Sequence, residues 1–189
     1  MPYTGTMQGA VQTGYFAHPP KLRPGQLEFV GQPHMIDSHP VESEFIHCGR
    51  GVIKGSPISV PAVGWGSDVM PFGVKATDGS VNANTAVSLF VGVLVFDAGA
   101  RNDSQGAAGK QQGDLAGILK TGFVGVKLFQ DTTPGGDVFL VADGSNAVSA
   151  PAGSFVSTNL SGKAFLIPKA KWWAKYSVAN SPCGILQLV

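Results

Sequence analysis

Residues 87–97, VSLFVGVLVFD, are the stretch that decides the fold. Valine recurs at every second position from Val91 to Val95, and β-branched side chains favour the pleated surface of a strand over a helix. Both faces of such a strand would be apolar, which indicates burial on both sides. The sequence therefore predicts a strand that is central in the body or buried at an interface, with a helix as the competing interpretation.

Similar short apolar runs, bounded by Gly, Pro, Asn and Asp, occur on both sides of this stretch. They predict strands over residues 51–55, 58–62, 72–76, 137–142, 155–158, 164–167 and 185–189. Residues 118–130 predict either two strands around a Lys-Thr-Gly turn or one strand with a bulge, and Asp-Gly pairs at 78–79 and 143–144 predict turns. Such regular turn spacing predicts an all-β fold, a jelly-roll or barrel-like antiparallel body. Two segments differ: residues 101–112 predict a mobile loop, and residues 169–179 hint at a short helix.

Residues 1–45 contain repeated prolines, which fix φ and push the preceding residue into extended geometry. We expect an extended N-terminal arm over 1–45 and a β-sandwich or barrel body over 46–189. The arm also carries large apolar side chains, which a disordered linker would lack. The candidate partner contacts among them are Tyr15, Phe16, Leu22 and Phe29. A loop that packs on its own domain explains these side chains equally well.

The charge balance excludes several classes of partner. Lys and Arg number 13 and Asp and Glu number 12, so the net charge is +1. This balance predicts no nucleic-acid partner and no polybasic contact with a membrane.

The longest apolar run is too short for a membrane-spanning helix of about 20 residues. No secretory signal is visible at the N-terminus, so we expect synthesis in the cytoplasm. The charged fraction of 13% is low and favours association with itself or with a partner. A Gly/Ser/Thr/Asn-rich β-protein with a polar but uncharged surface is the alternative, and the two are compatible.

Two adjacent aromatic residues, Trp172 and Trp173, lie between Lys171 and Lys175. An aromatic anchor with a basic rim is typical of a protein–protein interface. Adjacent residues face different ways in a strand or a helix, so we expect one of the two to lie off the core. Both are candidate partner contacts; a core tryptophan beside an exposed one, or a sugar-stacking platform, are the alternatives.

The residues that usually carry chemistry do not form a convincing site. His34, Asp37 and His39 could be drawn as a metal cluster, but an extended arm gives poor preorganisation and no fourth ligand follows. His47 and Cys48 would point to opposite faces of a strand, which separates a base from its nucleophile. We therefore predict no enzyme, no metal site and no cofactor.

Cys48 and Cys183 are the only cysteines, and they are far apart in the sequence. Their spacing matches no zinc or redox motif. Two free, buried thiols are expected, with a disulfide between them as the alternative.

The order of several segments resembles the structural cement, or capsid decoration, proteins of tailed bacteriophages. The segments that carry the resemblance are VESE at 41–44, GRGVIKG at 49–55, VGVLVFD at 91–97, QGD at 112–114, ILKTGFVGV at 118–126, GGDVFLV at 135–141 and GILQL at 184–188. The likeness extends over about residues 40–189; the Pro-rich arm is longer than the family pattern.

The resemblance implies a jelly-roll or barrel body that forms a homodimer or homotrimer. Such a protein would bind the outside of a phage capsid and stabilise contacts between subunits of the major capsid protein. It would be part of the virion surface, have no catalytic residues and need no cofactor. The alternative function is another virion surface β-module, such as a fibre, tail or carbohydrate-binding domain.

Overall fold

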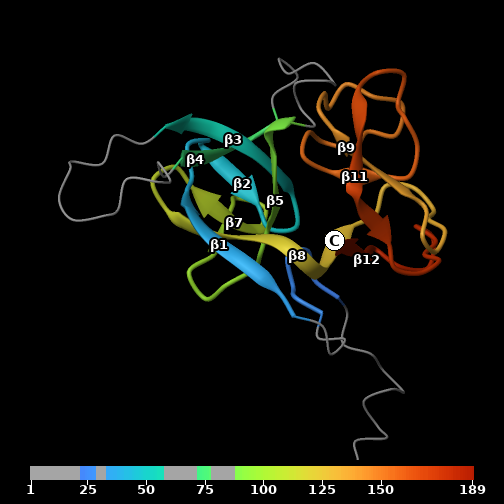
Figure 1. Cartoon of the computed structure of the whole chain (residues 1–189), viewed down its shortest axis with the longest axis horizontal. Helices are drawn as coiled ribbons and strands as arrows, with labels where there is room; N and C mark the ends of the chain where they lie inside the picture. The colour runs from blue at the N-terminus through green and yellow to red at the C-terminus, as the bar shows by residue number, and fades with distance from the viewer. Residues whose placement is uncertain (1–21, 29–32, 58–71, 78–87) are drawn as a thin grey trace, which may run out of the picture.

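The computed structural model describes residues 22–28, 33–57, 72–77 and 88–189 (Figure 1). All its named elements are β-strands, which confirms the predicted all-β class. The strands are β1 (Met35–Pro40), β2 (Phe45–His47), β3 (Gly51–Pro57), β4 (Phe72–Ala76), β5 (Phe90–Leu94), β6 (Arg101–Asn102), β7 (Ala108–Gln111), β8 (Leu115–Lys127), β9 (Asp137–Val141), β10 (Phe155–Val156), β11 (Ala164–Trp172) and β12 (Cys183–Leu188).

The long strand β8 organises the molecule. Its first half pairs antiparallel with β1 and β5, and its second half pairs antiparallel with β12. Gly122, with φ +127°, stands where the partners change. The resulting sheet has the order β10-β9-β11-β12-β8-β5-β3-β4 and curls into a half-barrel. Figure 1 shows β1–β7 on one side of β8, here called the N-terminal lobe, and β9–β12 on the other side, the C-terminal lobe.

The described residues form three apolar clusters, and β8 contributes to the two larger ones, one for each lobe. Ala116 and Ile118 are buried in the N-terminal cluster with Val52, Val74 and Leu94. The cluster of the C-terminal lobe is larger, and it includes Val93, Leu119, Val124, Val126, Phe155, Phe165, Trp172 and Leu186. Since successive side chains of a strand point to opposite faces, one strand can supply both clusters.

The strand predicted over residues 87–97 is confirmed as β5, which lies between β3 and β8. Val93 and Leu94 have no exposed surface, as expected for a strand covered on both faces. Of the predicted stretch 118–130, residues 118–127 belong to a single strand, β8, with a positive φ at Gly122 instead of a turn, and residues 128–130 lie beyond its end. The strand predicted over 58–62 and the turn at 78–79 lie outside the described residues.

Two local predictions are wrong. Residues 101–112 form the hairpin of β6 and β7, in which the Asp103 carboxylate accepts hydrogen bonds from the amides of Gln105 and Ala107. These hydrogen bonds from a side chain to the backbone stabilise the hairpin, although its sequence lacks the apolar alternation that normally indicates strands. Residues 169–172 continue β11, paired with β12, so the helix expected over 169–179 does not form.

The described part of the predicted arm lies on the body. β1 pairs with β8 from Met35 to Pro40. Residues 22–28 line the second half of β8, where the Gly25 amide donates to the Gly125 carbonyl at 2.7 Å and the Gly125 amide donates to the Gln26 carbonyl at 2.8 Å. The boundary between arm and body at residue 45 stays a prediction.

Candidate functional site

The predicted partner contacts of the arm fall into two groups. Tyr15, Phe16 and Phe29 lie outside the described residues. Leu22 is half-buried, and its side chain packs over Gly125 on the outer face of β8. Its Cγ atom stands 2.7 Å from the position that a Cβ on Gly125 would occupy, so only a glycine admits this contact.

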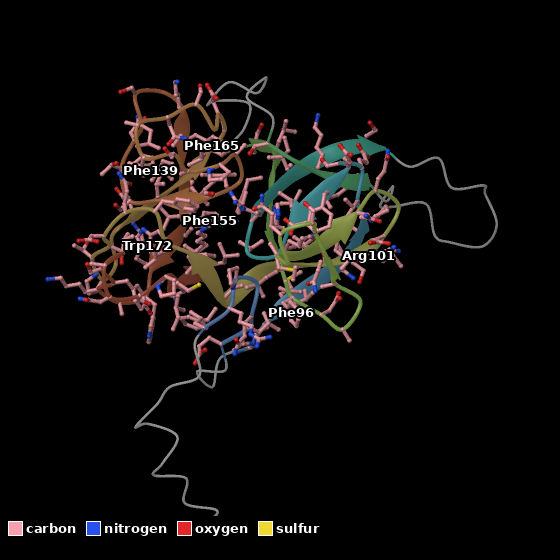
Figure 2. All side chains as sticks on the ribbon, turned by 180° about the vertical axis from the view of Figure 1, so that it is seen from behind. Phe96, Arg101, Phe139, Phe155, Phe165 and Trp172 are labelled. Carbon is pink, nitrogen blue, oxygen red and sulfur yellow. The ribbon has the colours of Figure 1, made fainter. Side chains whose placement is uncertain are left out.

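The two adjacent tryptophans point in opposite directions, as the sequence predicts. Trp172 is 1% exposed and belongs to the core of the C-terminal lobe, the lobe in which Figure 2 also places Phe155 and Phe165. Its side chain cannot reach a partner, which corrects the candidate role given to it. Trp173 is 45% exposed. Its ring stands edge-on against buried Phe123, with 4.9 Å between the ring centroids.

A second exposed apolar area lies on the outer face of β1 and β8. Ile36 is 40% exposed and Leu115 is 66% exposed. Gly117 lies between them in the strand register, because Ile36 is opposite Leu119, two residues after Gly117, and Leu115 is two residues before it. The Ile36 Cγ2 atom is 3.3 Å from the position of a Cβ on Gly117. We call Ile36, Gly117 and Leu115 the β1–β8 strip. Sequence reasoning missed Leu115, because an isolated leucine after a polar loop carries no signal of its exposure.

A broad groove separates the two lobes. It has a volume of about 1100 Å³, slightly above the roughly 300–1,000 Å³ of ligand pockets. We call it the inter-lobe groove and define it by the lining residues Arg23, His47, Arg50, Phe96, Asp103, Lys127 and Phe129. They come from the arm, from both lobes and from β8. Figure 2 shows Phe96 on the same side of the molecule as the arm, and its amide donates to the Gly25 carbonyl at 2.8 Å.

Arg50 is held firmly in this groove. Its Nη1 donates to the carbonyls of Pro151 at 3.1 Å and Ala152 at 3.2 Å, and to the Ser154 hydroxyl. The guanidinium stands 5.9 Å from the centroid of the Phe129 ring, and the Lys127 ammonium stands 5.4 Å from the same centroid. Burial lowers the pKa of Arg50, although a guanidinium remains charged in proteins.

The groove also contains the pair that could suggest a nucleophile and its base. His47 Nε2 lies 2.8 Å from the Asp103 carboxylate, whereas the Cys48 thiol donates to the Val95 carbonyl at 3.7 Å. Burial raises the pKa of Cys48 to about 11. A thiol with this pKa is almost fully protonated at neutral pH and is a poor nucleophile. Cys48 and Cys183 are both free and buried, as expected.

The histidines and the acid considered as metal ligands each have other contacts. Asp37 pairs with Lys120, and this hydrogen bond lowers the pKa of Asp37. His39 is buried, stacks on the Phe72 ring and has Nδ1 3.1 Å from the Phe72 carbonyl oxygen. Within the described residues, no three His, Cys, Asp or Glu side chains are grouped as a metal site would require. Nor does that part of the chain contain a helix that is long and apolar enough to cross a membrane.

The described surface thus offers exposed apolar side chains and an open cationic groove. Such features are typical of proteins that contact other macromolecules through their surface. The model of the structural cement protein family (E217 gp24/Pam3 gp6) matches residues 11–185, and the chain belongs to this family. This match confirms the predicted resemblance. The protein therefore has a structural, capsid-stabilising role.

A solved structure shows the same fold. It is titled "The capsid of Myoviridae Phage XM1", and the match covers 88% of this chain and 89% of that chain. The TM-score is 0.56 at 14% sequence identity, so the fold is shared although most residues differ. No curated protein matches the chain with statistical significance.

Proposed function

We propose that this protein binds the major capsid protein on the outer surface of the mature phage shell and bridges neighbouring subunits. The family match over residues 11–185 carries this proposal. A protein that binds only the assembled shell stabilises that state by mass action. The proposal places the protein on the virion surface after synthesis in the host cytoplasm, and assigns it no catalytic activity and no cofactor.

Trp173 is the anchor that we assign to the capsid contact. Its ring is exposed, yet contact with Phe123 restricts its orientation. A large side chain that is already oriented loses little conformational entropy on binding, so more of the contact free energy is retained. Exposed aromatic side chains are also enriched among the residues that dominate interface energies.

Self-association into a homodimer or homotrimer belongs to the same proposal. We assign it to the β1–β8 strip, where Ile36 and Leu115 expose apolar surface on an antiparallel pair of strands. An oligomer engages several capsid sites at once, and effective concentration then converts modest contacts into tight binding.

Co-sedimentation with purified capsids tests the proposed function. We expect saturable binding to expanded shells and none to unexpanded precursor shells. Glycan binding without capsid binding would instead support a carbohydrate-binding module. Light scattering coupled to size exclusion tests self-association: the wild type should be oligomeric and Leu115→Glu monomeric. An oligomeric Leu115→Glu variant would contradict the role of the strip.

A further inference from the structure

We propose that the inter-lobe groove binds an acidic polypeptide segment of the capsid protein that also presents an apolar side chain. This inference rests on the proposed function, because it names the part of the partner that one surface recognises. It concerns a place on the molecule distinct from Trp173 and from the β1–β8 strip. Its basis is the charge and the preorganisation of the groove.

The inter-lobe groove contains positive charges that no nearby carboxylate of the described residues neutralises. Arg23, Arg50 and Lys127 line it, and no carboxylate of the described residues lies within 4.0 Å of any of them. Five other Lys or Arg side chains pair with Asp at 4.0 Å or less, so ion pairing is common elsewhere. The net charge of the whole chain is only +1, so the positive charge in the groove is a local feature and not a general excess of basic residues.

Asp103 is the one acidic side chain among the described residues that line the groove, and it is already engaged. Asp103 bonds to His47 and accepts hydrogen bonds from the amides of Gln105 and Ala107 at 2.8 Å each. The same bonds lower the pKa of Asp103, His47 contributing most. Its charge is thus satisfied within the N-terminal lobe, and it does not neutralise the cations across the groove.

Arg50 is preorganised to receive a carboxylate. The three hydrogen bonds that its side chain makes to described residues all come from Nη1, so Nε and Nη2 donate to no described residue. The guanidinium lies over the Phe129 ring, and the Lys127 ammonium lies over the same ring. A planar guanidinium with free donors binds a carboxylate in bidentate geometry.

Phe96 supplies the apolar part of the site. It is 42% exposed and lines the same groove as the cations. A ligand that satisfies both features carries a carboxylate next to an apolar or aromatic side chain. A polypeptide fits this description better than a nucleic acid. Three cations can contact only a few phosphates, and the chain as a whole is almost neutral.

A charge-reversal variant tests the groove. Arg23→Glu combined with Lys127→Glu changes two exposed side chains that have no partner carboxylate to lose. Lys75→Glu combined with Lys169→Glu is the matched control, since it changes the net charge equally at lysines that line no part of the groove. Unfolding midpoints of both variants verify that they fold like the wild type.

Affinity for expanded capsids is measured by sedimentation at low and at high NaCl concentration. We expect the groove variant to lose at least about tenfold in affinity and most of its salt dependence. The control should stay within about twofold of the wild type. Phe96→Ala should weaken binding without changing the salt dependence, because it removes an apolar contact only.

Three outcomes would overturn the inference. A groove variant that binds like the wild type would rule out the groove as a capsid-binding site and leave the proposed function intact. An equal loss in the control would reduce the effect to net charge. Tighter binding of a single-stranded oligonucleotide than of the acidic probe peptide Ac-Glu-Phe-Glu-NH2, at the same groove amides by NMR, would replace the polypeptide with a nucleic acid. Failure of the wild type to bind any capsid would instead refute the proposed function, and this inference with it.

Discussion

Substitution of Gly25 by alanine should destabilise the protein strongly, although the residue belongs to a segment that the sequence marks as an arm. Gly25 has φ +80°, and a Cβ on it would lie 2.7 Å from the Cys48 Cβ and 2.8 Å from the Phe96 nitrogen. The left-handed backbone costs an alanine about 1–2 kcal/mol. Overpacking against these atoms adds about 1–3 kcal/mol. We therefore expect Gly25→Ala to lower the free energy of unfolding by about 2–5 kcal/mol.

Gly106 provides a matched control. Its φ is +81°, almost the same as that of Gly25, but a Cβ there has no atom within 4 Å. Gly106→Ala should therefore lose only the contribution of the left-handed backbone, about 1–2 kcal/mol of unfolding free energy. The difference between the two variants in denaturant unfolding isolates the close approach of residues 22–28 to the body. Equal losses in the two variants would refute this docking.

Local release is the other way in which Gly25→Ala can relieve the clash. In that case, residues 22–28 would detach while the rest of the fold remains. Hydrogen exchange distinguishes the two responses, because the amides of Phe96 and Gly125 bond to the carbonyls of Gly25 and Gln26. We expect faster exchange at both amides in Gly25→Ala and unchanged exchange there in Gly106→Ala.

Three further predictions follow from the described side chains. Trp173→Ala should weaken capsid binding at nearly unchanged stability, whereas Trp172→Ala should cost about 3–5 kcal/mol of unfolding free energy, since only the latter is a core residue. The lowered pKa of Asp103 means that the unfolded state takes up its proton first, so stability is lost as pH falls below about 4. Asp103→Asn should make this acid loss shallower in unfolding curves between pH 6 and 3. Cys48 should resist a thiol reagent at pH 8 in the folded protein and react on unfolding; rapid native-state labelling would contradict its burial and raised pKa.

Local sequence patterns predicted the strands that depend mainly on the residues next to one another in the sequence. The alternating valines of 87–97 predicted β5, and the run at 72–76 coincides with β4. The opposite orientation of Trp172 and Trp173 followed from strand geometry alone. The hairpin over 101–112 was missed, because Asp103 bonds to backbone amides in place of an apolar period.

The inter-lobe groove could not be predicted in this way. Arg23, Arg50 and Lys127 are spread over about a hundred positions of the sequence. Pairing of residues 22–28 with β8, and the place of β3 and β8 in one sheet, bring them to the same groove. Each is unremarkable in its own window, so the charge cluster is a product of long-range topology.

The groove also links the fold of the arm to its proposed task. Arg23 stands two residues before Gly25, whose carbonyl and amide fix the segment to Phe96 and to Gly125. If Gly25→Ala releases this segment, the groove loses one cation and part of the wall beside Phe96. Capsid affinity should then fall together with the protection of the Phe96 amide, although no residue of the proposed contact has been changed. Gly162→Ala should leave both unchanged, because Gly162 has φ +82°, a Cβ there has no atom within 4 Å, and the residue lines no part of the groove. A loss of affinity in that variant would show that general destabilisation, and not the position of Arg23, controls binding.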